Sequence, residues 1–402
     1  MMNEFLQHES LDWANIDNQP YFIGMMSGTS LDALDAVLCR FDDERPVVIE
    51  SHSVRFPDDL KAALLALTVP NGVSDYIQKN CLAFESELDV FGWASVFYGE
   101  LAASVVLELL HKAKVETESV CAIGCHGQTV RHRPKWHFSL QLLDPNVLTE
   151  RTGIAVVSDF RRRDMAVGGQ GAPLTPAFHE AIFNNFDEHG EKAVLNLGGI
   201  ANITLLSNGE RATIGFDTGC ANLLLDGWCK RHTGKDFDKD GNWAKTGQII
   251  PDLLGQLLTH PFFGQPYPKS TGREEFNLSW LDQELSIFDK TNPIPYTAAD
   301  VQATLIDLTA VSVAHALLQI AKHGKLVVCG GGALNDYLIE RLATHLPNWQ
   351  IHLSDDMGIP PMLVESLAFA WLARQTMLLR TGNLPSVTGA SQSVVLGQVC
   401  FP

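Results

Sequence analysis

The stretch YFIGMMSGTS, residues Tyr21–Ser30, decides the fold. Its first six residues form an apolar run, and its last four, Ser27–Ser30, are small or hydroxylated. A second apolar run lies at Leu34–Phe41, and a third follows a polar turn at Val47–Val54. Apolar runs separated by short turns are typical of strands. The stretch therefore begins a predicted three-stranded meander whose first turn is Ser27–Ser30.

The same order of runs and turns returns in the second half of the chain. The apolar run Ala193–Leu197 is followed by Gly198-Gly199 and by a second run, Ala201–Leu206. A third run, Ala212–Phe216, ends at a turn predicted over Asp217–Gly219. Two meanders, each with a glycine-containing turn after its first strand, indicate a duplicated domain with a cleft between the halves.

Helices are predicted between these meanders. Apolar residues recur at three- and four-residue spacing over Ala298–Ile320, and Thr297 is positioned to cap that helix. Further helices are predicted over Glu85–His111 and Met362–Leu372, whereas Pro251–Asn292 is interpreted as irregular. Strands and helices in this mixture predict an α/β fold with helices covering the sheets.

Composition and charge limit the classes of partner. The 402 residues include 47 acidic and 29 basic ones, for a net charge of −18, so we expect neither a nucleic-acid nor a membrane partner. No uninterrupted apolar run approaches the ~18 to 20 residues that span a bilayer. Met1–Gln19 lacks the regions of a signal peptide. The eight cysteines form no CxxC pair, as expected of free thiols in a reducing compartment. These features predict a cytoplasmic protein.

Three glycine-containing turns follow apolar strands: Ser27–Ser30, Asp217–Gly219 and Gly330–Gly332. Glycine lets successive backbone amides approach an anion such as a phosphate group. The carboxylates of Asp32 and Asp217 can hold a magnesium ion or its waters. The chain contains no GxxxxGK(S/T) and no GxGxxG motif, so a Walker or Rossmann nucleotide site is excluded.

A set of short motifs resembles those of the anhydro-N-acetylmuramic acid kinases. The set begins with MMSGTSLD at Met25–Asp32 and runs from about residue 21 to the C terminus, so only the N-terminal extension lies outside it. The other motifs are IGCHGQT (123–129), DFRRRD (159–164), GGQGAPL (168–174), LNLGGIAN (195–202), KSTGRE (269–274), CGGG (329–332) and PSVTGA (385–390).

The resemblance implies a two-lobed actin-like (ribonuclease H-like) fold with ATP in the cleft between the lobes. Residues 1–20 would then be an extension, 21–150 the first lobe joined by 385–402, and 151–384 the second lobe. The implied reaction opens the 1,6-anhydro ring of anhydro-N-acetylmuramic acid with water and phosphorylates O6, giving N-acetylmuramic acid 6-phosphate and ADP. The implied small-molecule substrates are this anhydro-sugar and ATP with Mg²⁺. A homodimer is left open.

The resemblance also implies which residues form the site. Asp217 would be the catalytic base, His126, Arg162 and Glu365 would bind the sugar, and Asp32 would contact Mg²⁺. Arg161 and Arg163 are further candidates for pairing with the lactyl carboxylate or a phosphate. The implied ATP-binding residues are Gly28, Thr29, Ser30, Leu31, Asp32, Ala33, Leu34, Asp35, Gly199, Gly330, Gly331 and Gly332.

One base suffices for such a reaction. Glycosidic cleavage ordinarily takes two carboxyl groups, but here the leaving oxygen O6 is also the phosphoryl acceptor, so no general acid is needed. Two positions depart from the family pattern: Ala33 replaces a glycine, and Cys220-Ala221 replaces Pro-Gly after Asp217-Thr218-Gly219. The alternatives are an actin-like-fold kinase for another sugar and an ATPase or binding protein of that fold that transfers no phosphate.

Overall fold

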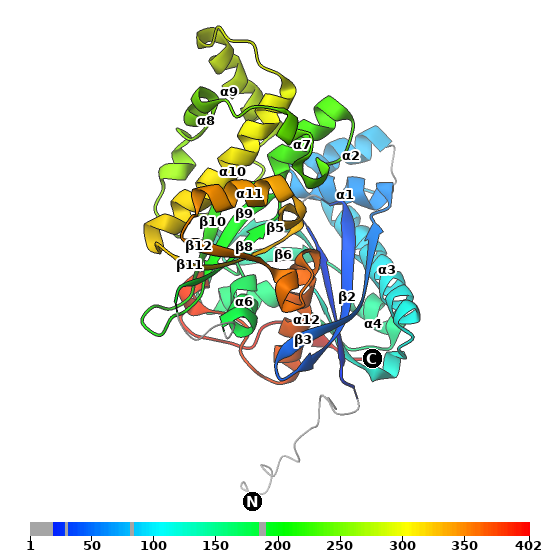
Figure 1. The fold of residues 1–402 in the computed structure, drawn as a ribbon. Helices are drawn as coiled ribbons and strands as arrows, with labels where there is room; N and C mark the ends of the chain where they lie inside the picture. Colours follow the sequence, from blue (N-terminus) through cyan, green and yellow to red (C-terminus); the bar gives the residue numbers. More distant parts are fainter. Residues whose placement is uncertain (1–18, 29–30, 81–83, 185–189) are drawn as a thin grey trace, which may run out of the picture. The chain divides into compact units, whose positions relative to one another are not determined.

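The computed structural model describes residues 19–28, 31–80, 84–184 and 190–402 (Figure 1). The chain forms two compact units: Met1–Leu174 with Glu365–Pro402, and Thr175–Val364. These boundaries differ from the predicted ones at 150/151 and 384/385. Residues 151–174 join the first unit because strand β7 (Val156–Ser158) pairs there with β4 (Val120–Cys125). Residues 365–384 join it because helix α12 (Val364–Met377) packs on its sheet.

The first unit is built on a sheet of six strands in the order β13-β7-β4-β1-β2-β3. The predicted meander forms the antiparallel strands β1, β2 and β3, and β4 and β7 continue from β1 in parallel. Strand β13 then pairs antiparallel with β7. The bounds of the strands not yet given are β1 Tyr21–Ser27, β2 Ala33–Asp42, β3 Arg45–Arg55 and β13 Gln398–Cys400. A separate hairpin joins β5 (Gln128–Arg133) to β6 (Phe138–Leu142).

The second unit repeats this topology. Its sheet has the order β10-β9-β8-β11-β12, which matches β3-β2-β1-β4-β7 strand by strand. The first three strands are antiparallel, and β11 and β12 are parallel to β8. The bounds are β8 Lys192–Leu197, β9 Ile200–Leu205, β10 Ile214–Cys220, β11 Gly324–Cys329 and β12 Trp349–Leu353. The two meanders thus lie in different sheets, which confirms the predicted duplication and the actin-like fold class.

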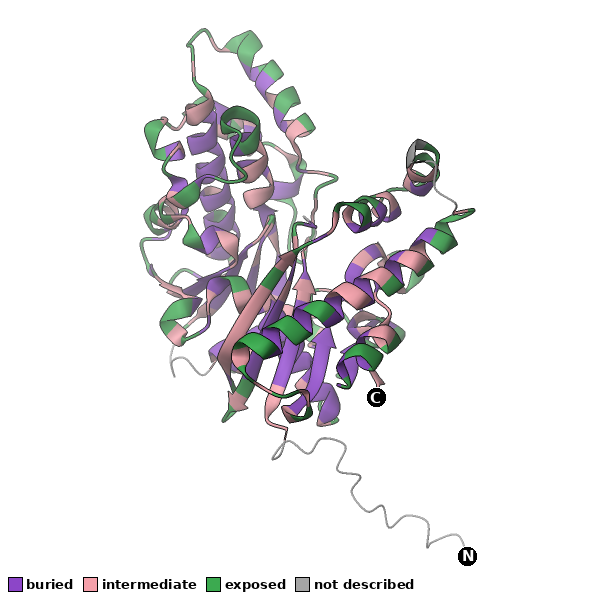
Figure 2. Ribbon diagram, turned by 90° about the vertical axis from the view of Figure 1, so that its right-hand side faces the viewer, coloured by how far each residue is buried: buried purple, intermediate pink, exposed green. Residues whose placement is uncertain are grey.

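Helices cover both sheets. In the first unit they are α1 Asp58–Thr68, α2 Gly72–Asn80, α3 Glu87–Ala113, α4 Pro145–Thr152, α5 Phe160–Ala166, α12 and α13 Pro385–Thr388. In the second they are α6 Thr175–Phe183, α7 Asn222–Thr233, α8 Pro251–Leu257, α9 Leu278–Thr291, α10 Ala298–Ile320 and α11 Asp336–His345. Figure 2 shows buried residues along the strands and on one side of many helices.

The helix predictions differ in their outcome. Thr297 caps α10 as predicted, with Asp300 completing a capping box. The helix predicted over Glu85–His111 is α3, which is continuous over 27 residues. The irregular interpretation of 251–292 is wrong, because it contains α8 and α9. Pro251 occupies the first turn of α8, and the Asn277 side chain caps α9 by accepting from the Trp280 N–H.

Two helices have the length and the apolar composition of membrane-spanning segments. Both α3 and α10 are long and apolar enough to cross a membrane by length and composition. Of their most apolar 18-residue windows, 50% and 72% respectively are buried inside the protein, as in the core helices of soluble domains. Each helix packs in the core of its own unit.

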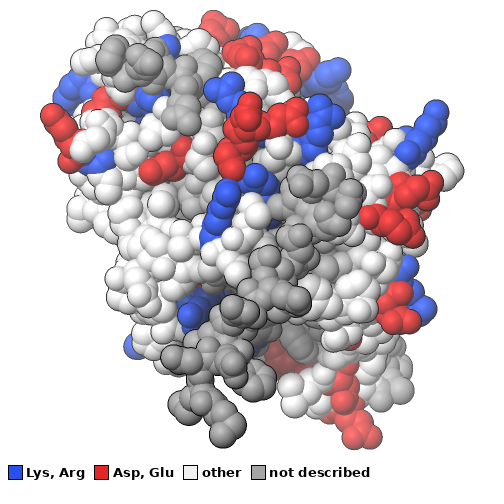
Figure 3. Space-filling view, turned by 90° about the horizontal axis from the view of Figure 1, so that it is seen from below, with Lys and Arg blue, Asp and Glu red and all other residues white. Residues whose placement is uncertain are grey.

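The described cysteines are all free. They are Cys39, Cys121, Cys125, Cys220, Cys229, Cys329 and Cys400, and all but Cys400 are buried. Cys81 lies outside the described residues. The prediction of unpaired thiols is therefore confirmed for these seven. On the face shown in Figure 3, acidic and basic side chains lie interspersed, so the acidic surplus forms no continuous patch across its visible part.

Candidate functional site

The turn after β1 is held by buried polar contacts. The Ser27 hydroxyl donates to Gln128 Oε1 at 2.7 Å and lies 3.1 Å from the Tyr98 hydroxyl. The Leu31 N–H donates to the Gly28 carbonyl at 3.2 Å, and Leu31 adopts a φ of 57°. A backbone hydrogen bond therefore joins Gly28 to Leu31, on either side of two residues that were predicted to contact phosphate. Thr29 and Ser30, predicted to contact ATP, lie outside the described residues.

The remaining predicted ATP residues of the first unit run into β2. Ala33 and the buried Leu34 begin that strand. Burial raises the pKa of the Asp35 carboxyl, and a hydrogen bond from Ser53 opposes the rise. The exposed Asp32 carboxylate pairs with Lys61 Nζ at 3.1 Å. Within the described residues no group of three or more His, Cys, Asp or Glu side chains could hold a metal ion. Magnesium is usually bound through one or two carboxylates and substrate phosphates, so Asp32 as a magnesium contact stays a prediction.

His126 is held by Arg161 at the end of β4. The Nε and Nη2 groups of Arg161 donate to His126 Nε2 at 3.2 and 2.9 Å. Because Nε2 accepts, the neutral ring carries its proton on Nδ1, and that buried atom faces the Gly127 carbonyl without forming a well-aligned hydrogen bond to it. Burial and then the Arg161 charge hold the pKa of His126 well below its usual value, against the opposing Gly127 carbonyl. The ring therefore presents a neutral N–H donor.

Helix α5 also fixes the loop that follows it. Arg161 donates to the Gly171 carbonyl at 2.8 Å, and Asp164 accepts from the Gly171 N–H at 2.8 Å. The Asp164 carboxylate, fully buried, also accepts from Asn383 and Thr388, each at 2.7 Å. These contacts explain why the DFRRRD, GGQGAPL and PSVTGA motifs occur together, since their residues form one polar cluster.

Glu365 lies near the start of α12, in the neighbourhood of Arg161. Burial lowers the pKa of Arg161 to about 10, and the charge of Glu365 opposes this shift. One turn further along α12, the Phe369 ring lies 4.8 Å from the His126 ring, centroid to centroid. The first unit thus brings together His126 and Glu365, both predicted, and Arg161, which sequence reasoning ranked below Arg162.

Arg162 does not belong to this group of residues around His126. Its guanidinium is half exposed and pairs with the Asp159 carboxylate, which raises the pKa of Arg162. Arg163 is exposed as well. Three consecutive arginines cannot share one face of a helix, because successive residues are turned by about 100°. The structure therefore selects Arg161, which is less exposed than Arg162 and Arg163 and lies against His126.

Asp217 lies inside β10 rather than in a turn after it, so the predicted turn at Asp217–Gly219 is wrong. The strand continues because Asp217 and Gly219 pair with Asn202 and Ala201 of β9 across an irregular register. Asp217 Oδ2 accepts from the Ser270 hydroxyl at 2.8 Å and from the Thr271 N–H at 3.0 Å. Burial raises the pKa of Asp217, and these two hydrogen bonds oppose the rise. A partly buried carboxylate with raised pKa suits a general base.

The glycine turns of the second unit gather at the same edge of its sheet. Parallel strands β8 and β11 end there, and the Asn222 side chain at the start of α7 donates to the Leu197 carbonyl of β8 at 2.9 Å. A Cβ on Gly330, whose φ is 79°, would lie 2.4 Å from Asn196 Oδ1, and one on Gly332 would lie 2.6 Å from Leu197 Cβ. Gly199 accepts from the backbone of α7. Sequence reasoning missed Asn222, although it ends the DTGCAN segment.

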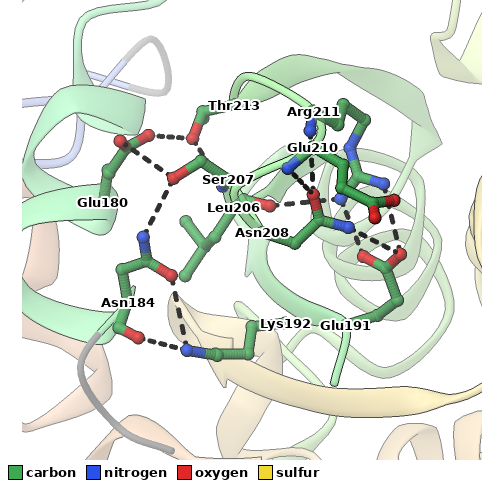
Figure 4. A network of polar contacts seen from close by, with 10 residues as sticks. All are labelled: Glu180, Asn184, Glu191, Lys192, Leu206, Ser207, Asn208, Glu210, Arg211 and Thr213. Atoms are coloured by element: carbon green, nitrogen blue, oxygen red, sulfur yellow. Dashed lines mark hydrogen bonds and ion pairs between the residues drawn. The ribbon is translucent and has the colours of Figure 1, made fainter. Parts of the chain in front are cut away.

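The opposite edge of this sheet carries a polar network with a different character (Figure 4). Glu180 of α6 accepts from Ser207 and Thr213, and Arg211 pairs with Glu191 at 2.7 Å. The network ties α6 to the β9–β10 turn. The candidate site is therefore placed at the other edge, which carries Gly199, Asp217 and Gly330.

Comparison with known proteins identifies the family. A family model described as anhydro-N-acetylmuramic acid kinase matches residues 20–402. The anhydro-N-acetylmuramic acid kinase of Psychrobacter cryohalolentis is 52% identical over 98% of this chain and 97% of its own length. That of Shewanella oneidensis is 45% identical over 94% of this chain and 98% of its own.

Solved structures give remote likenesses. The activator of the 2-hydroxyisocaproyl-CoA dehydratase from Clostridium difficile is 14% identical over 89% of this chain and 96% of its own, with a TM-score of 0.45. A ROK family glucokinase from Streptomyces griseus is 15% identical over 88% of this chain and 99% of its own, with a TM-score of 0.38. The match over residues 20–402 and the near-complete coverage of the relatives decide the assignment: this chain belongs to the anhydro-N-acetylmuramic acid kinase family.

Proposed function

We propose that this chain uses ATP and water to convert 1,6-anhydro-N-acetylmuramic acid into N-acetylmuramic acid 6-phosphate and ADP. The observation that carries the proposal is Asp217, a partly buried carboxylate with raised pKa at the edge where the glycine turns of its unit gather. Membership of the kinase family supplies the reaction class. Asp217 takes one proton from water as the water oxygen bonds to C1, and this proton is later released to solvent.

The other bonds change at O6. The C1–O6 bond breaks, and O6 bonds to the γ-phosphorus as the bond from that phosphorus to ADP breaks. The electron pair that leaves C1 therefore becomes the new O–P bond, so no separate acid has to protonate O6. For the attack of water on C1, this scheme requires one ionisable group, Asp217.

The phosphates of ATP are assigned to the glycine turns at Gly28 and Gly330–Gly332 and to the Gly199 turn. Leu31, Asp32, Ala33, Leu34 and Asp35 continue the first of them. These turns belong to different units, so their joint action on ATP stays a prediction. Magnesium would be held by the phosphates together with Asp32, because this ion is usually bound through one or two carboxylates and substrate phosphates.

The anhydro-sugar is assigned to His126, Arg161 and Glu365. The neutral Nδ1–H of His126 is a buried donor that forms no well-aligned hydrogen bond with the described residues, which suits a sugar oxygen. Arg162 remains a candidate for the lactyl carboxylate, because its half-exposed guanidinium pairs only with Asp159 among the described residues. A cytoplasmic location fits both ATP as substrate and the seven free cysteines.

Isotope labelling tests the proposal. The protein is incubated with ATP and the anhydro-sugar in oxygen-18 water, and the products are analysed by mass spectrometry. We expect label at C1 of a sugar phosphate. Label in free phosphate with no sugar product would identify an ATPase that transfers nothing. Phosphorylation of a competing sugar in preference to the anhydro-sugar would identify a kinase of other specificity.

A further inference from the structure

We propose that Ser270 is a positioning residue for Asp217, which fixes one carboxylate oxygen, keeps the group ionised and leaves the other oxygen for water. The inference rests on the proposed function, since it gives Asp217 the role of base. Ser270 lies in a loop 53 positions along the chain from Asp217, and its hydroxyl donates to Asp217 Oδ2 at 2.8 Å.

The two carboxylate oxygens of Asp217 differ in their hydrogen bonds. Oδ2 accepts two hydrogen bonds, from the Ser270 hydroxyl and the Thr271 N–H. No hydrogen bond to Oδ1 is formed by the described residues of 19–28, 31–80, 84–184 and 190–402. A carboxylate whose Oδ2 is held by two donors cannot turn freely about its last torsion angle. The proton acceptor toward water is therefore Oδ1.

The loop that carries Ser270 is itself fixed. The Lys269 carbonyl accepts from the Asp217 N–H at 3.0 Å, so backbone and side chain of Asp217 meet the same segment. Lys269 Nζ donates to the carbonyls of Phe262 and Phe263 at 3.0 and 3.3 Å. On the other side, the Thr271 hydroxyl donates to Glu275 Oε2 at 2.5 Å. Ser270 therefore lies between two residues that are both hydrogen-bonded to neighbouring segments.

Packing does not explain Ser270. Its side chain is exposed, so it fills no core space, and its only described side-chain hydrogen bond goes to Asp217. A surface serine with a purely structural role would affect neither the ionisation of Asp217 nor the pH dependence of turnover. Removing its hydroxyl takes away one of the two contacts that oppose the effect of burial on the pKa of Asp217. The pKa must then rise further.

The test compares Ser270→Ala with Ser270→Thr and wild type. In Ser270→Ala, we expect the acid limb of the kcat/KM profile to move to higher pH, because Asp217 is protonated over a wider range. Turnover at neutral pH should fall about tenfold to a hundredfold, the range for a hydrogen bond to a charged group, with the KM for ATP unchanged. Ser270→Thr keeps a hydroxyl and should restore both the limb and the rate.

Two readouts separate this inference from the proposed function. Carbon-13 NMR of aspartate carboxyls, assigned by the loss of one signal in Asp217→Asn, measures the pKa of Asp217 without turnover. The exposed Ser279→Ala, on α9, is the matched control and should leave the profile unchanged. If wild type forms no sugar phosphate, the proposed function fails. If wild type is active and Ser270→Ala changes neither the pKa nor the acid limb, the inference on Ser270 is overturned.

Discussion

Gly24 on β1 and Gly124 on β4 are register partners, and the backbone of α12 lies directly against both of them. A Cβ on Gly24 would lie 1.8 Å from the Ser366 carbonyl oxygen, and one on Gly124 would lie 2.0 Å from that of Phe369. No side chain can fit between sheet and helix at these points. The two glycines therefore determine the depth of α12 and, with it, the place of Glu365.

Adding a methyl group at either glycine should push α12 away from the sheet. For Gly24→Ala and Gly124→Ala we expect the free energy of unfolding to fall by about 1–3 kcal/mol, the usual cost of overpacking. The KM for the sugar should rise if Glu365 contacts it. Urea denaturation and steady-state kinetics measure the two effects.

The control for these variants is Gly92→Ala in α3. A Cβ there has nothing within 4 Å, and alanine is the better helix former by about 0.5–1 kcal/mol. The same substitution should therefore stabilise the protein at Gly92 and destabilise it at Gly24. Equal effects at both sites would show that α12 adapts to the added methyl group.

Asp217→Asn should remove the proposed base while preserving the shape of the side chain. We expect turnover to fall by about two to four orders of magnitude, the range for a general base. Binding of ATP, followed by calorimetry, should survive because the glycine turns are unchanged. An Asp217→Asn protein with normal turnover would remove Asp217 from the catalytic role.

Arg161→Gln and Arg162→Gln should behave differently. The first leaves His126 Nε2 and the Gly171 carbonyl without their donor, which should lower the free energy of unfolding by about 1–3 kcal/mol. It should also raise the pKa of His126, because one cause of its lowering is lost. The second breaks an exposed pair and should change stability by less than about 1 kcal/mol. Thermal unfolding and proton NMR of the histidine ring measure these effects, and a larger loss for Arg162→Gln would contradict the assignment.

Asp32→Asn should weaken the use of magnesium-ATP with little effect on folding, since the carboxylate is exposed. Lys61→Met is the matched variant, because it breaks the same ion pair and leaves the carboxylate in place. We expect the KM for ATP to rise in Asp32→Asn and to stay near the wild-type value in Lys61→Met. A similar rise in both variants would mean that the ion pair, rather than a nucleotide contact, accounts for the effect.

The sequence by itself determined the elements whose signal is local. The runs Tyr21–Met26 and Ala193–Leu197 with their turns predicted both meanders, and Thr297 marked the start of α10, because apolar runs and capping depend on a few neighbouring residues. The motif set predicted the family, and the match over residues 20–402 confirms it.

Only the tertiary structure decided which side chains meet. Arg161 rather than Arg162 contacts His126, because the turn of α5 directs successive arginines to different sides. The Ser270 hydroxyl reaches Asp217 across 53 residues, and Asp217 stays within β10 because β9 pairs with it. Residues 151–174 and 365–384 belong to the first unit for the same reason, since strand pairing and helix packing place them there. Strand pairing and helix packing join residues far apart in the chain, and no local pattern records such contacts.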